Sequence, residues 1–216
     1  GVQTCALPIF TILTIQKRYL ITTPDETIWK NNQPVIFLGE WCCLYERKHI
    51  WQNMDAIVAK PYGLDTSKKD ADFSKIRELQ QKLFPKFCEI LNQHHNTCHS
   101  ERFWKILLGH WFKRVLVLLL NRINTLKQCF QLYKISGTAV YKNDSYLASI
   151  DSTHINTACI DDRWNNTLNA RIIDLLEVDF PIEFLPSKYN LDVSPGGKLK
   201  YVSTHQPFKM KIINWF

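Results

Sequence analysis

The chain has 216 residues, of which 45% are hydrophobic, and a formal net charge of +7. This composition can bury a sizeable core, which excludes a disordered chain. The seven cysteines are scattered without a CxxC pair, which indicates reduced thiols in a cytosolic protein, and the longest strongly apolar run, Val115 to Leu120, is too short to cross a membrane.

Both ends of the sequence suggest a piece of a longer protein. The chain begins at Gly1 without an initiator methionine, and residues 1–9 (GVQTCALPI) resemble the translation of a sequencing adapter. The other end, FKMKIINWF, stops on an apolar run. We therefore expect a non-native leader over residues 1–9 and an incomplete amino-terminal α/β domain over residues 10–216.

The first part of the chain predicts alternating strands and helices. The best early strand lies at Tyr19–Thr22, and Val35–Leu38 is a continuous apolar run typical of a strand buried on both faces of a parallel sheet. We expect Gly39 to let the backbone turn sharply. A helix over 44–55 and a short strand over 56–59 then complete a β-α-β unit.

The middle of the chain predicts long helices. Apolar residues recur at helical spacing between Phe73 and Asn92, although Pro85 predicts a break into two short helices. Ser100 is an N-cap candidate for the strongest helix, which we expect to end near Phe130.

The last part of the chain has weaker patterns. We expect a strand at 139–141, a helix at 163–176 and a loop-rich stretch at 181–205. Together with the earlier elements, these predict an α/β fold with a parallel sheet of about four strands, covered by long helices.

Acidic, basic and aromatic side chains follow the buried strand within about three helical turns. Ligands of open α/β sheets bind at the carboxyl ends of the strands, so this stretch is our first candidate site. The candidate residues are Glu40, Trp41, Tyr45, Arg47 and His49.

Each of these candidates has a structural alternative. Glu40 could be a general base whose pKa is raised by apolar neighbours such as Trp41, or a structural acid at the start of a helix. Arg47 and His49, with Lys48 between them, could hold a phosphate or carboxylate of an acceptor, or could form the solvated face of a helix.

The positive charge is concentrated on the long helix. Between Glu101 and Lys134, seven Lys or Arg residues accompany one acid. At about 100° per residue, much of this charge falls on one stripe, which could contact anionic lipid headgroups or simply face solvent. The stripe contains Arg102, Lys105, Lys113, Lys127 and Lys134, and the first four are the candidate lipid contacts.

Two further motifs carry chemistry-bearing side chains. The HHxxCH cluster at 94–99 has zinc-ligand residue types, but one short cluster rarely closes a tetrahedron, so we expect no metal. In the DDRWN motif at 161–165, Asp162 and Asn165 could bind sugar hydroxyls or a divalent ion, but Asp162 as the cap of the following helix is the simpler explanation. No GxGxxG, GxSxG or HExxH motif is present, and we predict no cofactor.

Several tryptophan-rich runs resemble a known family. FLGEWC followed by LYERKHIW, with RYLITTPDETIW before and HSERFWKILLGHW after, is similar to the amino-terminal half of a surface-carbohydrate (O-antigen region) transferase family. The similarity extends from about Arg18 to about Phe130 and returns at IDDRWNN near Asp161.

The resemblance implies a reaction class without a catalytic residue. It implies a two-domain transferase that moves a group from an activated sugar donor to a saccharide or lipid-linked acceptor. If the basic stripe contacts lipid, this cytoplasmic protein would lie at the inner face of the cytoplasmic membrane. If the donor binds mostly in the missing half, the isolated chain should be inactive.

Two other classes of function stay open. A sequence pI near 9.0 and many aromatic residues permit nucleic-acid binding, but no binding motif is present, so we expect no nucleic-acid partner. The other alternative is a non-catalytic scaffold of the same polysaccharide pathway.

Overall fold

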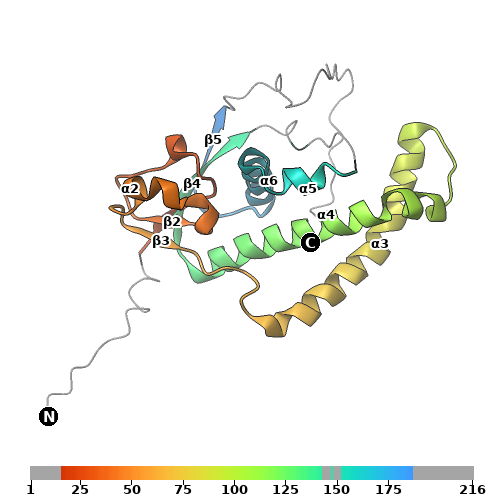
Figure 1. The fold of residues 1–216 in the computed structure, drawn as a ribbon, viewed down its shortest axis with the longest axis horizontal. Coiled ribbons are helices and arrows are strands. Elements are labelled where there is room, and N and C mark those ends of the chain that lie inside the picture. Colours follow the sequence, from red (N-terminus) through yellow and green to blue (C-terminus); the bar gives the residue numbers. More distant parts are fainter. Residues whose placement is uncertain (1–15, 143–146, 148–151, 187–216) are drawn as a thin grey trace, which may run out of the picture.

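Five parallel strands form one sheet in the order β3-β2-β1-β4-β5 (Figure 1). The structure is a computed structural model, and it describes residues 16–142, 147 and 152–186. The predicted α/β class is therefore confirmed, with one strand more than expected. The strands are β1 (Arg18–Ile21), β2 (Val35–Phe37), β3 (Ala56–Val58), β4 (Ile135–Lys142) and β5 (Ile182–Pro186).

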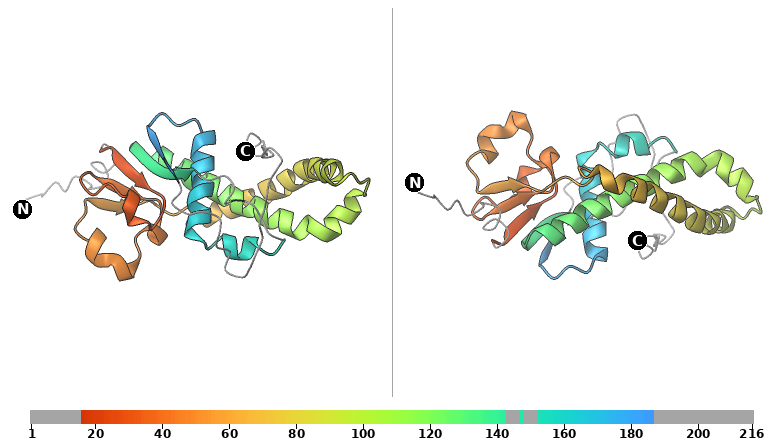
Figure 2. Two further views of the ribbon diagram at one scale, coloured as in Figure 1. Left: turned by 90° about the horizontal axis from the view of Figure 1, so that it is seen from above. Right: turned by 90° about the horizontal axis from the view of Figure 1, so that it is seen from below.

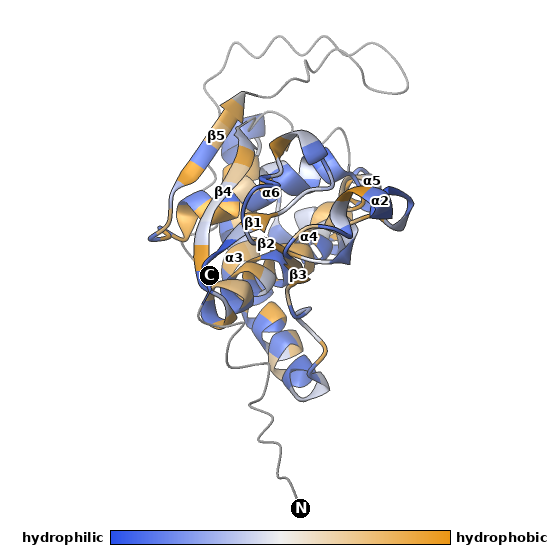
Figure 3. Ribbon diagram, turned by 90° about the vertical axis from the view of Figure 1, so that its left-hand side faces the viewer, coloured by the Kyte–Doolittle hydropathy of each residue, from blue (hydrophilic) through white to orange (hydrophobic). Residues whose placement is uncertain are grey.

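The extra strand, β5, lies in a stretch that we expected to be a loop. It pairs with β4, with Thr138 opposite Ile182 and Lys142 opposite Pro186. A proline at the end of a strand is tolerated at the edge of a sheet, which is where β5 lies. Figure 3 shows β5 beside β4 at the edge of the sheet, and Ile182 and Leu185 pack against the sheet core, while Phe184 is 41% exposed.

Strand β2 is buried along its whole length, as its apolar sequence predicts. It lies between β1 and β3, with Ile36 opposite Leu20 on one side and Ile57 on the other. Branched and aromatic side chains suit such a doubly covered position. The buried strand from which the candidate site was predicted is therefore present.

The connections from β1 to β3 contain only short helices. They are η1 (Glu26–Ile28), η2 (Glu40–Cys42), η3 (Tyr45–Arg47) and α2 (Lys48–Trp51). The predicted helix over 44–55 is wrong, because only one turn of α-helix forms there. Neither Leu44 nor Arg47 supplies a side-chain cap to the short helices that they precede, and the segment has few buried residues to hold a longer helix.

The connection from β3 to β4 is a long helical hairpin. After η4 (Thr66–Lys68), α3 (Lys69–His95) runs outward and α4 (Glu101–Leu132) returns to the sheet (Figure 1). The N-cap prediction is confirmed, since the Ser100 hydroxyl accepts a hydrogen bond from the Phe103 amide at 3.3 Å. The end of α4 lies two residues beyond the predicted Phe130.

The predicted break of α3 at Pro85 is wrong. The helix continues through the proline, and Leu83, Phe84 and Cys88 on either side of it are buried against α4. A proline in a helix costs about 3 kcal/mol in an isolated helix. Burial of several large side chains beside the proline outweighs this cost.

The last two helices are α5 (Ile155–Ala158) and α6 (Asp162–Leu175). Helix α6 packs on β4 and on the part of α4 nearest to the sheet (Figure 2). Its N-cap is Asp161, whose carboxylate accepts from the Trp164 amide at 2.7 Å. The predicted cap at Asp162 is therefore wrong by one residue, because Asp161 has the extended backbone that a cap needs.

Candidate functional site

The order of the strands defines the edge at which a ligand would bind. Strands β1 and β4 are neighbours in the sheet. The chain continues from β1 to β2 on one side of this pair, and from β4 to β5 on the other side. In open parallel sheets, the crevice at the carboxyl ends of two such strands is the usual ligand site. We call this edge the rim, and define it by residues 22–29 after β1, residues 38–47 after β2 and the start of α6.

A buried asparagine joins the elements at this switch point. Asn166 of α6 donates to the Thr22 hydroxyl and accepts from the Tyr141 amide, both at 3.1 Å, and is only 1% exposed. A buried amide is stable only when its donor and acceptor are satisfied, as here. Sequence reasoning missed Asn166, because an asparagine within a helix gives no local signal of its long-range partners.

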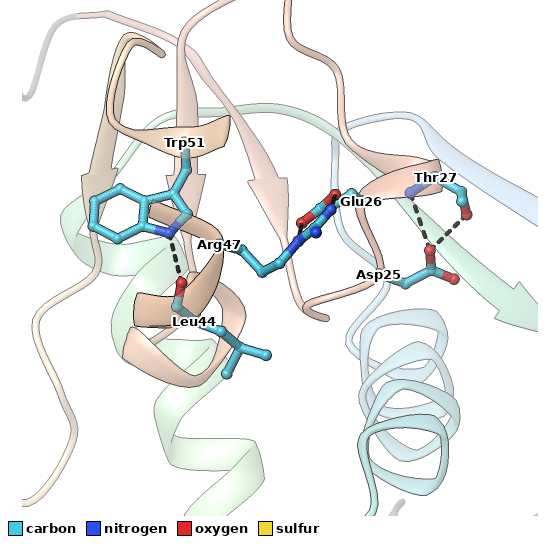
Figure 4. A network of polar contacts seen from close by, with 6 residues as sticks. All are labelled: Asp25, Glu26, Thr27, Leu44, Arg47 and Trp51. Carbon is cyan, nitrogen blue, oxygen red and sulfur yellow. Dashed lines mark hydrogen bonds and ion pairs between the residues drawn. The ribbon is translucent and has the colours of Figure 1, made fainter. Parts of the chain in front are cut away.

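The loop after β1 is held to the end of β4 by an aspartate. Asp25 caps η1, with one carboxylate oxygen accepting from the amide of Thr27 at 3.0 Å and from its hydroxyl at 2.6 Å (Figure 4). The other oxygen accepts from the Tyr141 hydroxyl at 2.7 Å. These bonds give Asp25 a structural role at the rim.

An ion pair joins the loops after β1 and β2. Both Glu26 carboxylate oxygens accept from the Arg47 guanidinium at 2.7 Å, in a bidentate arrangement (Figure 4). This hydrogen bond to Arg47 lowers the pKa of Glu26. The predicted anion-binding role of Arg47 stays a prediction, and it would require a substrate anion to replace Glu26.

Gly39 and Trp41 determine the shape of the loop after β2. Gly39 has φ −170° and ψ 171°, so the expected sharp turn at this residue is wrong. A Cβ at this position would lie 2.1 Å from the Trp41 ring, so any other residue would force the indole to move. The indole packs across the backbone and stays 40% exposed, while Glu40 beside it is solvent-exposed.

Arg122 of α4 connects two of the predicted site residues. Its Nε and Nη2 donate to Asn165 Oδ1 at 3.2 and 3.0 Å, and its guanidinium carbon lies 5.9 Å from the centre of the Trp41 ring. Its Nη1 donates to Asn121 Oδ1 at 3.3 Å. Among the described residues, no Asp or Glu forms an ion pair with Arg122.

The environment of Arg122 is unusual for an arginine. Partial burial lowers its pKa, and its hydrogen-bond acceptors are neutral amides. Asn165 is held in place because its Nδ2 donates to the backbone oxygens of Cys159 and Asp161, which turns its side-chain oxygen toward the guanidinium. Sequence reasoning missed Arg122, which was counted only as one of the positive charges on a long helix.

The other predicted residues lie on the surface around this cluster. Tyr45 is 81% exposed, with the Lys48 ammonium 5.9 Å from its ring centre, and His49 is exposed on α2. Partial burial and the neighbouring Asp161 raise the pKa of Asp162, the first residue of α6. None of these three candidates is joined to Arg122 by a hydrogen bond or ion pair in the part of the chain that the structure describes.

The HHxxCH cluster packs around the start of α4. The His95 ring lies 6.1 Å from Trp104, and the His99 ring stacks on Phe103 at 4.0 Å. In the described ranges, no group of three or more His, Cys, Asp or Glu is arranged to hold a metal ion. The six cysteines described there are free thiols.

A surface depression lies away from the rim. An open depression of about 440 Å³ lies at the amino ends of β2 and β3, lined by the loops that lead into these strands. It is at the edge of the sheet opposite the rim, so we do not place the site there.

None of the helices in the described residues combines the length and the apolar composition required to span a membrane.

Comparison with known proteins identifies a family. A family model described as the LIC12162 family transferase matches residues 18–215. No curated protein and no solved structure matches the chain. The match begins where the resemblance to a transferase family was expected to begin, and it includes both the rim and the helical hairpin. The chain therefore belongs to the LIC12162 family of transferases.

Proposed function

We propose that this transferase acts in the biosynthesis of a surface polysaccharide of the O-antigen type and transfers a glycosyl group. We further propose that its rim binds a saccharide that carries an anionic group, such as a phosphate. One observation carries this proposal: Trp41, Arg122 and Asn165 meet at the rim, and the hydrogen-bond partners of the guanidinium among the described residues are neutral amides.

The electrostatics of Arg122 support an anionic ligand. A partly desolvated cation without a counter-charge is unfavourable, and a phosphate or carboxylate at this position would remove that cost. A guanidinium has five N–H groups, of which three already donate to amides. One hydrogen on each of Nη1 and Nη2 is left, which suits two oxygens of one anion.

The neighbouring side chains support a sugar. The exposed face of Trp41 provides a flat apolar surface beside the cation, and Asn165 holds the guanidinium in position next to it. Small-molecule sites typically combine aromatic walls with a few oriented polar groups. Asp162, at the start of the same helix as Asn165, supplies a carboxylate that we propose accepts hydrogen bonds from sugar hydroxyls.

We propose that Glu40 is the general base of the reaction. In this scheme its carboxylate takes the proton of an acceptor hydroxyl. The hydroxyl oxygen then forms a bond to the anomeric carbon of the donor, and the bond from that carbon to the leaving phosphate breaks. The exposed Tyr45 and His49, and Arg47 once released from Glu26, would contact the acceptor.

A binding experiment separates the anionic from the sugar contribution. We would measure binding of glucose 1-phosphate, methyl glucoside and inorganic phosphate by saturation-transfer NMR. Arg122→Gln should weaken glucose 1-phosphate binding by about tenfold, since a hydrogen bond to a charged group contributes about 1.5–3 kcal/mol. It should not alter methyl glucoside binding, whereas Trp41→Ala should weaken binding of both sugars.

Arg102→Gln is the matched control, because Arg102 is an exposed arginine on the same helix. Equal effects of Arg102→Gln and Arg122→Gln would contradict the proposed anion site. Absence of binding by all three probes would contradict it as well.

A second experiment tests the role of Glu40 in cells that produce the protein. Glu40→Gln would replace the chromosomal copy, with Glu46→Gln, another exposed acid of the same loop, as the control. Loss of surface polysaccharide only in Glu40→Gln cells, with normal amounts of folded protein, supports the general base. Normal polysaccharide in both strains would favour a scaffold or another base.

A further inference from the structure

Helix α4 exposes apolar side chains on the face that points away from α3. Ile106 is 78% exposed and Leu107 59% exposed, and Phe103 and Val117 are exposed to a smaller extent. Isolated exposed apolar residues are common on proteins, but a contiguous group usually marks an interaction surface.

The spacing places these residues on one continuous face. At about 100° per residue, Phe103, Ile106, Leu107 and Val117 lie within an arc of about 140°. Buried residues of the same helix, such as Phe112, lie on the opposite side against α3. The α3–α4 contact therefore covers one side of α4, and these four side chains are exposed on the other side.

Cationic side chains share this open face. Arg102 and Lys113 fall within the same arc and are exposed, with His110 between them. No Asp or Glu occurs in the sequence from Arg102 to Val117. We call the set Arg102, Phe103, Ile106, Leu107, His110, Lys113 and Val117 the α4 face.

Three other basic residues of α4 are placed differently. Lys105 is exposed and lies outside this arc, about 60° from Arg102 around the helix. Lys127 is only half-exposed and lies toward the sheet end of the helix. Arg114 falls within the same arc, but it donates to the Asn156 side chain of α5.

We propose that the α4 face binds the surface of an anionic membrane. Its apolar side chains would enter the boundary between headgroups and acyl chains, while Arg102 and Lys113 contact anionic headgroups. The charge favours lipid over a second copy of the chain, because two α4 faces in contact would bring cations together. This proposal does not depend on the proposed reaction.

Vesicle sedimentation tests the proposal with the full 216-residue chain. The protein should sediment with vesicles of phosphatidylcholine and phosphatidylglycerol, and less so as salt concentration rises. It should not sediment with phosphatidylcholine alone. The double variant Ile106→Glu/Leu107→Glu should reduce the bound fraction to background.

Two further variants complete the experiment. Arg102→Gln/Lys113→Gln should weaken binding by about fivefold for each lost charge, since a basic residue near such a surface contributes about 1 kcal/mol. Leu64→Glu is the control, because Leu64 is 64% exposed but lies outside the α4 face. Circular dichroism would establish that each variant is folded.

Three outcomes would overturn the proposal. The first is no binding to anionic vesicles, and the second is binding that survives Ile106→Glu/Leu107→Glu. The third is a dimer, seen by analytical ultracentrifugation, that the same double variant dissociates, because the α4 face would then bind a second copy.

Discussion

The sheet region and the helical hairpin are stabilised by different cores. The sheet core draws aliphatic side chains from β1, β2, β4, α4 and α6, and its centre, including Leu20 and Ile36, is fully buried. The hairpin core is a single seam between α3 and α4, rich in aromatic residues such as Phe84 and Phe112, whose rings are 5.2 Å apart. The sheet core is enclosed by several elements, whereas the hairpin core is formed by two helices alone.

This difference separates two tasks within one chain. The enclosed sheet holds the rim in place, because elements from distant parts of the sequence are clamped at the ends of β1 and β4. The hairpin extends away from the sheet (Figures 1 and 2), and Ile106 and Leu107 of α4 are exposed on it. A rigid site and an exposed contact surface therefore require different packing.

The largest effect should come from truncation in the sheet core. Ile36→Ala is expected to lower the free energy of unfolding by about 2–5 kcal/mol, because a fully enclosed cavity cannot collapse. Chemical denaturation would measure it. Val58→Ala in the neighbouring strand, at a partly exposed position, should cost much less. Similar losses in both variants would contradict the contrast between enclosed and edge positions.

A matching truncation in the hairpin should have a smaller and more local effect. Leu79→Ala should cost about 2–3 kcal/mol, near the low end for such changes, because a seam open on one side can close partly. The reactivity of the cysteine thiols toward a labelling reagent shows which of the two cores has been loosened. Cys88 in the seam should become reactive, while Cys42 and Cys129 in the sheet core should stay protected, since burial raises the pKa of both thiols to about 12.

Equal labelling of all three cysteines in Leu79→Ala would show that the two cores unfold together. The contrast between the regions would then be wrong in its energetic part.

The clamp at the rim should have an intermediate effect. Asn166→Ala leaves the buried Tyr141 amide without its acceptor, which should cost about 1–3 kcal/mol. Asn169→Ala on the same helix is the control, because the buried Asn169 side-chain oxygen has no hydrogen-bond partner in the described ranges and should be cheaper to remove. A greater loss in Asn169→Ala would argue against the clamp.

The smallest effect should come from the Glu26–Arg47 ion pair, which is exposed at the surface. The hydrogen bond from Arg47 lowers the pKa of Glu26. The ion pair therefore stabilises the fold at pH values above 4.5, the ordinary pKa of Glu26, and this stabilisation is lost as the pH falls through the lower pKa of the folded state. Glu26→Gln should remove this part of the pH dependence, as measured by unfolding between neutral and acidic pH. Glu78→Gln, from an exposed pair within α3, serves as the control.

Local patterns were sufficient for much of the fold. The apolar run at 35–38 predicted β2, and Ser100 predicted the start of α4, because a strand buried on both faces and a capped helix both leave a signal among adjacent residues. The same reasoning failed at Pro85, where packing against α4 overrides the local preference. It also failed at β5, which is a strand because β4 offers an edge for pairing.

The candidate site was predictable only in part. Trp41 and Asn165 were chosen for their residue types and for their positions after a strand and at a helix start. That they belong to one cluster depends on Arg122, which reaches Asn165 across 43 positions of sequence. A contact of this kind leaves no periodicity or local motif, so no sequence pattern could have revealed it.

The sequence by itself determined the α/β class, the central buried strand and the concentration of positive charge on one helix, because these depend on composition and on the spacing of nearby residues. Only the tertiary structure decided which charges meet. It paired Arg47 with Glu26, surrounded Arg122 with neutral amides and exposed one face of α4. The reason is physical: the energy of a charge or an apolar side chain depends on what surrounds it in space, and folding brings those surroundings from distant parts of the chain.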